Sequence, residues 1–337
     1  MVRDSVNGES AQSRYSTFSQ DLIQKTKILE DALPVKDESC RSRFFLHPEK
    51  TPKVCLFFHG FTATPEQFAA IGEYFFEAGY NVLIPLLPGH GIAGNWNQEN
   101  PPPLPEEQQS YKDVGIYWLQ MSQEIGKEVV IGGLSGGSTL CAWLAIERAI
   151  QIHRALLFAP YLSGSNKVVD LFVWTFNIYF QWKTKPGHAH FGYDGFLMPA
   201  LRLFLEMGEE ILEMAKTRYS APMFIISSAS DRAVGEKAHE ALFEAVSRHQ
   251  PKSWYDCFDQ GLDIQHNMMT KAEGNEHLDL LLAIAKAYID SEITWNEVEQ
   301  IRDLLNQGYS FKTAVTQLHL SQHVSPDLFL MLATSEH

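Results

Sequence analysis

The 337-residue chain has no long apolar run and contains few cysteines. No stretch approaches the 18 consecutive apolar residues that a membrane-spanning helix needs, so stable membrane insertion is not expected. The four cysteines, Cys40, Cys55, Cys141 and Cys257, form no C-x-x-C pair, and the polar residues 1–20 show no secretory leader. We therefore expect reduced core thiols rather than disulfides or zinc ligands, and a cytoplasmic protein.

Basic residues are also scarce relative to acidic ones. The chain has 27 Lys and Arg residues against 41 Asp and Glu residues, a formal net charge of −14 with neutral histidine. This surplus of negative charge repels a phosphate backbone, and no local basic patch is evident, so no nucleic-acid partner is expected. Apolar residues make up 45% of the chain. That is enough for the core of one large α/β domain or of two ordinary domains.

Short apolar runs alternate with helical patterns through most of the chain. Continuous apolar runs of this length indicate strands buried on both faces, and their alternation with helices predicts a mostly parallel sheet with helices on both faces. In such a sheet the ligand site lies at the carboxyl ends of the strands. The expected strands cover residues 43–46, 54–58, 81–84, 129–134, 155–158, 222–227 and 254–258.

Residues 1–15 are polar and are expected to be mobile. Farther on, Thr64 and Gln67 flank Pro65 and predict a capping box that opens a helix over residues 65–78.

A serine stands at the tip of a glycine-rich turn between an apolar strand and a helix. Residues 129–139 read VVIGGLSGGST, which places Ser135 in a Gly-x-Ser-x-Gly setting. Such a turn strains the serine backbone, and Gly133 and Gly137 remove the Cβ atoms that would collide there. Because Gly136 begins a helix, its free N–H and the positive end of the helix dipole face any oxyanion formed at the serine. Alone, the pattern could be a plain Gly/Ser turn; the context on both sides of it favours a nucleophilic serine.

A serine hydroxyl needs a neighbouring imidazole to take its proton, and the imidazole needs a carboxylate to fix its tautomer and stabilise its charged form. Asp231 follows the expected strand at 222–227, and His266 lies in the loop after the expected strand at 254–258. The carboxyl edge of the sheet would gather both residues beside Ser135. We therefore predict a catalytic triad of Ser135, Asp231 and His266.

Each partner of the serine has a rival in the sequence. Asp231 could instead cap the next helix. For the base, His277 competes with His266, but His277 opens the closing helix and would point along it. His59 and His90 lie in turns and are interpreted as structural residues that hold the loops. The other carboxylates lie in or just after the last expected strand: Asp256, Asp259 and Asp263.

The order of the triad residues, the serine turn and the HGF loop after the first buried strand resemble the α/β-hydrolase superfamily. The resemblance covers about residues 41–289. The pairing of HGFT at 59–62 with LPGHG at 87–91, below a short helical cap, is most similar to the bacterial carboxylesterase and monoacylglycerol lipase group. The resemblance implies an α/β-hydrolase fold without cofactor or metal, and an oxyanion hole formed by the backbone N–H groups of Phe61 and Gly136.

The alternation of strands and helices breaks over residues 161–220, which are rich in aromatic residues. We interpret this segment as a helical cap, and its rings above a nucleophile favour an apolar substrate pocket over packing alone. The α/β-hydrolase core is then expected at 37–160 and 221–290. A polar segment with a peripheral helix precedes it at 1–36, and accessory helices follow at 291–337.

The leading function is a serine hydrolase that cleaves a small lipophilic carboxylic ester. Acyl transfer or amide cleavage on the same triad stays open, because the acyl-enzyme is common to all three reactions. A non-catalytic binding module also stays open, since a fold does not dictate a function. Dehalogenase and epoxide hydrolase chemistry is disfavoured, because those relatives carry an aspartate where Ser135 stands. His188 and His190 lack a convincing third metal ligand. The helices at 291–337 are expected to form a packed bundle or a homodimer contact.

Overall fold

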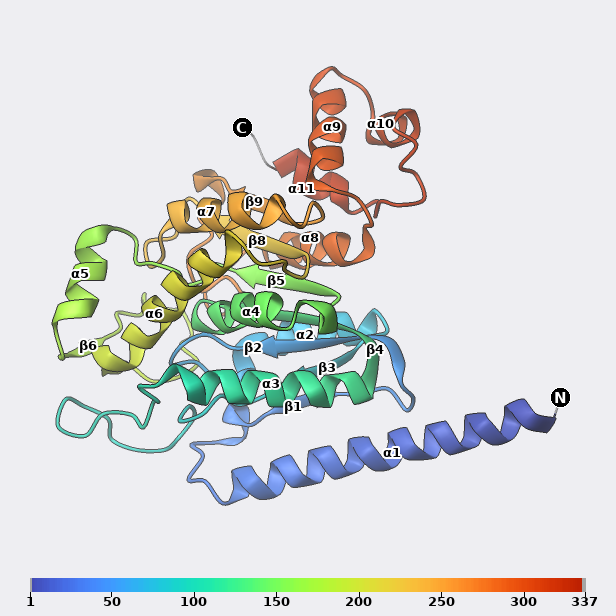
Figure 1. The fold of residues 1–337 in the computed structure, drawn as a ribbon. Helices are drawn as coiled ribbons and strands as arrows, with labels where there is room; N and C mark the ends of the chain where they lie inside the picture. The colour runs from blue at the N-terminus through green and yellow to red at the C-terminus, as the bar shows by residue number, and fades with distance from the viewer. Residues whose placement is uncertain (1, 335–337) are drawn as a thin grey trace.

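A seven-stranded, mostly parallel sheet forms the centre of the molecule (Figure 1). The computed structural model describes residues 2–334, and the side chains of residues 12–334. Residue 1 and residues 335–337, at the outer ends of the segments expected at 1–36 and 291–337, therefore lie outside the described chain. The strands of the sheet are β1 (Arg43–Phe45), β2 (Thr51–Phe58), β3 (Asn81–Ile84), β4 (Gly126–Leu134), β5 (Arg154–Phe158), β8 (Met223–Ser228) and β9 (Trp254–Phe258).

The strands lie in the order β1-β3-β2-β4-β5-β8-β9. β1 pairs antiparallel with β3, and the other neighbouring strands run parallel. In the middle of the sheet, Leu56 lies opposite Ile131, which lies opposite Ala155. All three side chains are fully buried. Burial on both faces explains the continuous apolar runs in the sequence, and the predicted mostly parallel sheet is confirmed.

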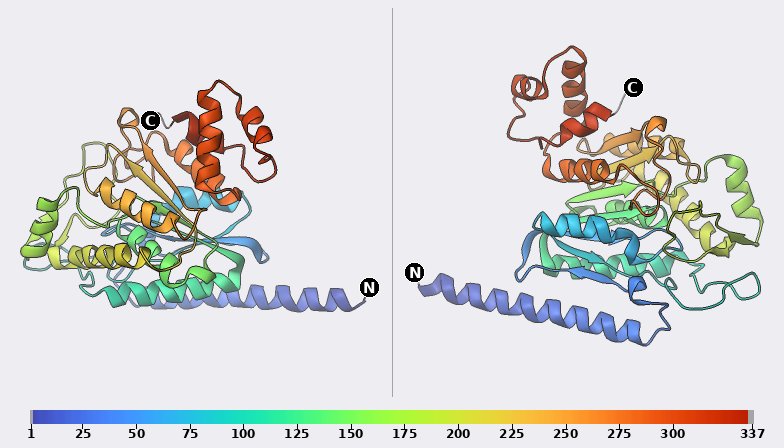
Figure 2. Two further views of the ribbon diagram at one scale, coloured as in Figure 1. Left: turned by 45° about the horizontal axis from the view of Figure 1, so that its top comes forward. Right: turned by 180° about the vertical axis from the view of Figure 1, so that it is seen from behind.

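Helices cover both faces of this sheet. Figure 1 views the face covered by α3, α4 and α7, and the reverse view in Figure 2 brings α2 and α8 to the front. The strand arrows point toward the segment between β5 and β8, so the carboxyl ends of the strands meet beneath that segment. The helices are α2 (Ala69–Glu77), α3 (Gln108–Ile125), α4 (Gly136–Glu147), α7 (Glu236–Ser247) and α8 (Leu278–Asp290). Short 3₁₀ helices cover Glu38–Cys40, Pro65–Phe68, Ala149–Gln151 and Gln260–Leu262.

The capping box expected at Thr64 is wrong. The chain passes through a 3₁₀ helix before α2 begins, and the Thr64 side chain makes no capping hydrogen bond. The Gln67 side chain, expected to bond back to Thr64, has tertiary partners instead. Gln67 Oε1 accepts from the Gly60 N–H at 2.8 Å, and Gln67 Nε2 donates to Glu273 Oε1 at 2.8 Å. These buried partners outweigh the local motif, because a buried amide must satisfy all of its polar groups.

The segment between β5 and β8 forms a cap over the strand ends. It contains α5 (Lys167–Thr175), β6 (Tyr179–Gln181), β7 (Gly195–Leu197) and α6 (Met198–Ala215). The expected helical character is confirmed for α5 and α6, but the antiparallel pair of β6 and β7 was not predicted. Its three-residue strands are too short to produce a readable alternation. In this pair, the ring centroids of Phe180 and Phe196 lie 5.6 Å apart.

The N-terminal helix α1 spans Val2–Asp31 and includes the described part of the polar segment 1–15, whose expected mobility stays a prediction. No proline interrupts this stretch. Tyr15 and Leu22 are buried against the body, and the Tyr15 hydroxyl donates to the His47 carbonyl at 2.9 Å. The start of α1 extends beyond the body (Figures 1 and 2). None of the helices in residues 2–334 combines the length and apolar character needed to cross a membrane.

The C-terminal segment forms further helices beyond α8, at the end of the molecule opposite α1 (Figure 1). Ser310 caps the second of them, since its Oγ accepts from the Thr313 N–H at 3.2 Å. Leu328 and Met331 are fully buried where the last helix packs on α8. The helices therefore form a packed accessory bundle, and the homodimer contact stays a prediction. The helices are α9 (Trp295–Asn306), α10 (Phe311–Gln317) and α11 (Leu328–Thr334).

Candidate active site

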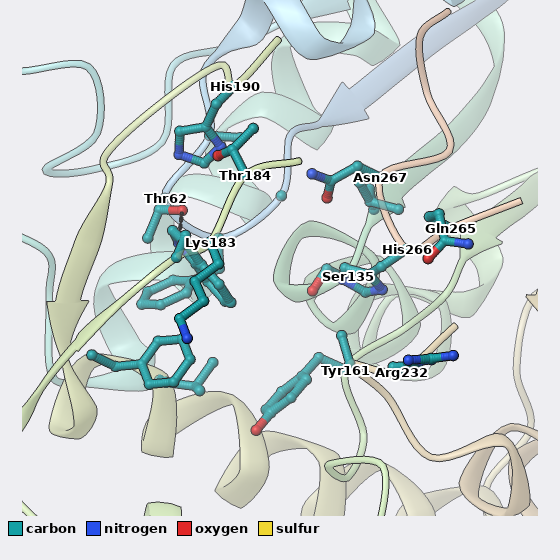
Figure 3. A pocket seen from close by; sticks show the side chains of 18 of the residues that line it. Thr62, Ser135, Tyr161, Lys183, Thr184, His190, Arg232, Gln265, His266 and Asn267 are labelled. Atoms are coloured by element: carbon teal, nitrogen blue, oxygen red, sulfur yellow. Dashed lines mark hydrogen bonds between the residues drawn. The ribbon is translucent and has the colours of Figure 1, made fainter. Parts of the chain in front are cut away.

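Ser135 lies at the sharp turn between β4 and α4. Its backbone has φ 54° and ψ −119°, a conformation that L residues rarely adopt. The Ser135 N–H donates to the Phe158 carbonyl at 3.1 Å, and the Ser135 carbonyl accepts from the Thr139 N–H at 2.9 Å. These bonds fix the strained turn from both sides. The serine side chain lines a cavity above the sheet edge (Figure 3).

Two glycines of this turn occupy places where backbones pass too closely for a side chain. A Cβ on Gly133 would lie 2.5 Å from the Gly137 carbonyl, and a Cβ on Gly137 would lie 2.3 Å from the Phe58 carbonyl oxygen. The interpretation of both glycines from sequence is therefore confirmed. Gly136 is the first residue of α4, so its backbone N–H has no acceptor within the helix.

Asp231 and His266 form a hydrogen-bonded pair just past the ends of β8 and β9. His266 Nδ1 donates to Asp231 Oδ2 at 2.7 Å. The Asp231 side chain is 3% exposed and the His266 side chain 21%. Asp231 Oδ1 accepts from the N–H groups of Ala233 and Val234, at 2.7 and 3.4 Å. The carboxylate thus caps the following turn with one oxygen and orients the imidazole with the other, which leaves His266 Nε2 to accept a proton.

The pair shifts the pKa of both groups toward the charged forms. Burial raises the pKa of the Asp231 carboxyl, but His266 and the backbone N–H groups outweigh burial and hold this pKa below its ordinary value. Burial likewise lowers the pKa of His266, yet the Asp231 carboxylate, helped by Glu273, raises it above the ordinary value of 6.5. Asp231 is therefore ionised near neutral pH, and it stabilises an imidazolium on His266.

Ser135 and His266 line the same cavity, and Figure 3 draws both side chains at its centre. Among the described residues, the His266 ring has its hydrogen bond to Asp231 and none to the Ser135 hydroxyl. Hydrogen bonds between a nucleophile and its base are often long without substrate and tighten in the complex. The structure thus brings the three residues to one sheet edge, with one of the two expected hydrogen bonds formed.

The loop after β2 has one backbone N–H without an acceptor in the described part of the chain. Its neighbours on both sides are engaged: Gly60 donates to Gln67 Oε1, and Thr62 donates to His90 Nε2 at 3.2 Å. The Phe61 N–H has no acceptor within the described chain, and Phe61 lines the cavity. A free N–H in a loop whose other donors are fixed is the arrangement that an oxyanion hole requires.

Two histidines hold these loops in place. His59 Nε2 accepts from the Leu87 N–H at 3.1 Å, and His59 Nδ1 donates to the Gly60 carbonyl at 3.1 Å. His90 Nδ1 donates to the Pro88 carbonyl at 2.9 Å. Burial lowers the pKa of His59 and lowers the pKa of His90 to about 4. Both rings are therefore neutral and committed to hydrogen bonds with the backbone, and the structural roles predicted for them are confirmed.

The cavity above Ser135 has a volume of about 680 Å³ and a mostly apolar lining. This volume is typical of sites for small organic ligands. The lining rings pack on one another, and the ring centroids of Phe61 and Phe196 lie 4.9 Å apart. The large apolar lining residues are Phe61, Leu134, Tyr161, Val168, Val169, Phe172, Val173, Phe180, Trp182, Phe191, Phe196, Met198 and Leu201.

The charged groups that line the cavity differ in sign between buried and exposed positions. Glu273 is the one carboxyl among the described lining residues, and it is 4% exposed. His188 and His190 also line the cavity, but the described residues contain no group of three His, Cys, Asp or Glu side chains that could hold a metal ion. The exposed charges of the lining are cationic: Lys183, Lys185 and Arg232. Figure 3 shows Lys183 entering from the cap.

The rivals considered for the triad lie outside the cavity lining. His277 adjoins the start of α8, where its N–H donates to Asn275 Oδ1 at 2.8 Å. Asp259 caps a 3₁₀ turn by accepting from the Gly261 N–H at 2.6 Å. Asp263 accepts from the neighbouring Gln265 side chain.

Sequence reasoning missed several polar contacts beside the serine. Gln67 was interpreted as a helix cap, and Glu273 was not considered. The available signal was a glutamate seven residues after His266, in a loop that contains Met268 and Met269. Also missed was a link between cap and core, in which Trp182 Nε1 donates to Thr62 Oγ1 at 3.0 Å. These contacts join residues far apart in the chain, so no local pattern announces them.

A mostly parallel sheet, a serine at a strand-to-helix turn and a cap inserted between β5 and β8 define the α/β-hydrolase fold. The chain therefore has the α/β-hydrolase fold, as its resemblance implied.

Comparisons of sequence agree with this class. The family described as serine aminopeptidase, S33, matches residues 49–191. A thermostable monoacylglycerol lipase from Bacillus sp. (strain H-257) is 31% identical over 99 residues. This match covers 29% of the chain and 37% of that enzyme, so the chain matches little more than a third of the relative's length.

Solved structures with lipolytic titles share the fold. One structure comes from the work on LipS and LipT, two metagenome-derived lipolytic enzymes, and has a TM-score of 0.60 and 18% identity. The match covers 75% of this chain and 98% of the chain in that structure. The monoacylglycerol lipase of Paleococcus ferrophilus has a TM-score of 0.56 and 14% identity, over 74% of this chain and 97% of its own. A soluble variant of the Saccharomyces cerevisiae monoglyceride lipase has a TM-score of 0.56 and 12% identity, and the match covers 74% of this chain and 90% of that lipase's chain.

Proposed function

We propose that the protein is a serine hydrolase that cleaves carboxylic esters of lipophilic substrates through an acyl-enzyme, in the manner of carboxylesterases and monoacylglycerol lipases. The observation that carries the proposal is the His266–Asp231 hydrogen bond of 2.7 Å at the cavity that Ser135 also lines. A serine becomes a useful nucleophile near neutral pH only beside such an oriented base.

In the proposed mechanism, His266 Nε2 takes the proton of Ser135 Oγ as this oxygen attacks the ester carbonyl carbon. The carbonyl electron pair moves onto its oxygen, and the N–H groups of Phe61 and Gly136 stabilise the resulting oxyanion. Asp231 holds the His266 Nδ1–H and stabilises the imidazolium. When the carbonyl re-forms, the C–O bond to the alcohol breaks, and the alcohol leaves with the proton of His266.

The second half of the reaction repeats these steps with water. His266 takes a proton from a water molecule, whose oxygen attacks the acyl carbon bound to Ser135. When this intermediate collapses, the bond from the acyl carbon to Ser135 Oγ breaks and the serine regains its proton from His266. The carboxylic acid then leaves, and no metal or redox cofactor is required.

The lining of the cavity supports a lipophilic substrate. Aromatic and aliphatic side chains from both the cap and the core surround the space above Ser135. Burying an acyl or aryl group there yields about 25 cal/mol per Å² of apolar surface removed from water. The similarity to a monoacylglycerol lipase favours glycerol monoesters among the substrates to be tried.

A hydrolysis screen combined with active-site labelling tests this function. We expect the full-length protein to hydrolyse p-nitrophenyl esters and monoacylglycerols across a range of acyl lengths, and a fluorophosphonate probe to label Ser135, as read by peptide mass spectrometry. Well-folded protein that neither labels nor turns over any ester in the screen would leave the binding-module alternative standing.

The pH profile of kcat/KM tests the assigned base. Because the imidazole must be neutral to accept the serine proton, activity falls as pH decreases through the pKa of His266. This pKa is raised above 6.5, so we expect the acidic inflection of kcat/KM above pH 6.5, with about a tenfold loss per pH unit below it. Initial rates between pH 5 and 9 at constant ionic strength measure it. A flat profile down to pH 5 would exclude His266 as the base.

Amide cleavage and acyl transfer remain alternatives that share the acyl-enzyme. An aminopeptidase must bind the positively charged amino terminus of its peptide, for which an exposed carboxylate is the natural partner. The exposed charged groups lining this cavity are cationic, which favours esters over amino-terminal peptides. Including amides and an alcohol acceptor in the screen separates the three reactions.

A further inference from the structure

Glu273 is a buried carboxyl at the cavity that no step of the proposed mechanism uses. It lies in the loop that follows His266, is 4% exposed and lines the cavity. Burial raises the pKa of this carboxyl to about 7. Burying an ionisable group costs folding free energy. Such groups are often found at functional sites, so Glu273 is a candidate for a functional role.

The Glu273 carboxyl has hydrogen-bond partners on two sides. Glu273 Oε1 accepts from Gln67 Nε2 at 2.8 Å, and Glu273 Oε2 accepts from Thr270 Oγ1 at 3.1 Å. The Thr270 hydroxyl in turn accepts from the Glu273 N–H at 3.0 Å. The contact with Thr270 is local, whereas the contact with Gln67 spans 206 residues of sequence.

The Gln67 amide connects Glu273 to the loop after β2, which carries the Phe61 N–H. Gln67 Oε1 accepts from the Gly60 N–H at 2.8 Å, so the amide must turn its NH₂ group toward Glu273. The peptide between Gly60 and Phe61 carries the next N–H, the one without an acceptor. A Cβ on Gly60 would lie 3.1 Å from Gln67 Oε1, so the glycine lets the amide approach closely.

We propose that Glu273 is a positioning residue for the hydrolytic reaction. Through Gln67 it fixes the loop that aims the Phe61 N–H at the developing oxyanion, and it ties this loop to the segment that carries His266. This inference rests on the proposed function and adds to it a link between the oxyanion hole and the base. The oxyanion hole and the base must keep their places relative to Ser135, because misplacement by an ångström costs a large factor in rate.

Variants of equal size test the link. Glu273→Leu and Gln67→Met keep the volume but remove the hydrogen bonds, and each is expected to lower kcat by about 10- to 100-fold with KM within threefold, because the loss falls on the transition state. Glu273→Gln retains an oxygen for Gln67 and an NH₂ group for Thr270, so it is expected to recover kcat to within threefold of the wild type. The double variant of Glu273→Leu and Gln67→Met is expected to lose no more than either single one.

Glu30→Gln is the matched control. Glu30 is also a buried glutamate whose pKa burial raises; it accepts from Ser42 and lies outside the cavity lining. This variant is expected to keep the wild-type kcat. Circular dichroism and thermal unfolding establish folding for every variant, and Gln67→Met carries the test if Glu273→Leu does not fold.

The outcomes separate this proposal from the function on which it rests. If the wild type hydrolyses esters and Glu273→Leu and Gln67→Met both keep kcat within twofold, the positioning role is refuted while the hydrolase remains. Losses that multiply in the double variant, or a Glu273→Gln variant as slow as Glu273→Leu, also refute it. If the wild type neither turns over esters nor labels with fluorophosphonate, the proposed function fails and the positioning role falls with it.

Discussion

Replacing Ser135 by alanine is expected to lower kcat/KM for p-nitrophenyl esters by at least about 1,000-fold, because the variant has no oxygen with which to form the acyl-enzyme. The fold should stay intact. Alanine occupies the same strained backbone position (φ 54°) as serine, and among the described residues no hydrogen bond to the Ser135 hydroxyl is lost. The change in unfolding free energy should therefore stay below about 1 kcal/mol. Steady-state kinetics and thermal unfolding measure the two quantities.

Ser138→Ala is the matched control for this variant. Ser138 lies three residues on in α4, is fully buried and has a hydroxyl without a hydrogen-bond partner in the described chain. Its removal should leave turnover within about threefold and fluorophosphonate labelling intact. If Ser135→Ala keeps wild-type turnover in pure protein, the nucleophile has been assigned to the wrong residue.

Replacing Asp231 by asparagine is expected to lower kcat by about 1,000-fold or more. An amide can present its NH₂ group to His266 Nδ1, which would put the proton on Nε2 and leave no base facing Ser135. The acidic inflection of any residual activity should move to lower pH, because the carboxylate that raises the pKa of His266 is gone. The kinetic pH profile of the variant measures both effects.

The same substitution should change how stability depends on pH. The pKa of Asp231 is lower in the folded protein than its ordinary value. Its ionisation therefore contributes stability that is present above the ordinary aspartate pKa and is lost as pH falls through the folded pKa. The free energy of unfolding of the wild type should thus exceed that of Asp231→Asn by more at pH 7 than at pH 3, as measured by urea unfolding.

Two controls address the rival residues. Asp259→Asn keeps a side-chain oxygen for the Gly261 N–H, and His277→Gln alters a residue outside the cavity lining. Both should keep kcat within about threefold of the wild type. A loss in either variant as large as that of Asp231→Asn would transfer the assignment to that rival.

Local chemistry explains how much of the architecture could be predicted. Strands buried on both faces require continuous apolar runs, so the strands at 81–84 and 254–258 were predicted with their observed bounds. The turn at Ser135 was readable because the approach of the Gly137 and Phe58 backbones excludes a Cβ and leaves a glycine signature. The short strands β6 and β7 left no such signature.

The sequence by itself determined the parallel sheet and the strand-to-helix turn of Ser135, because burial and steric exclusion act on neighbouring residues. It also nominated Asp231 and His266 by their places after strands. Only the tertiary structure decided which imidazole meets which carboxylate, and that Gln67 binds Gly60 and Glu273 rather than capping its own helix. The reason is physical: a polar side chain bonds to whatever the fold brings near, and that partner can lie 206 residues away.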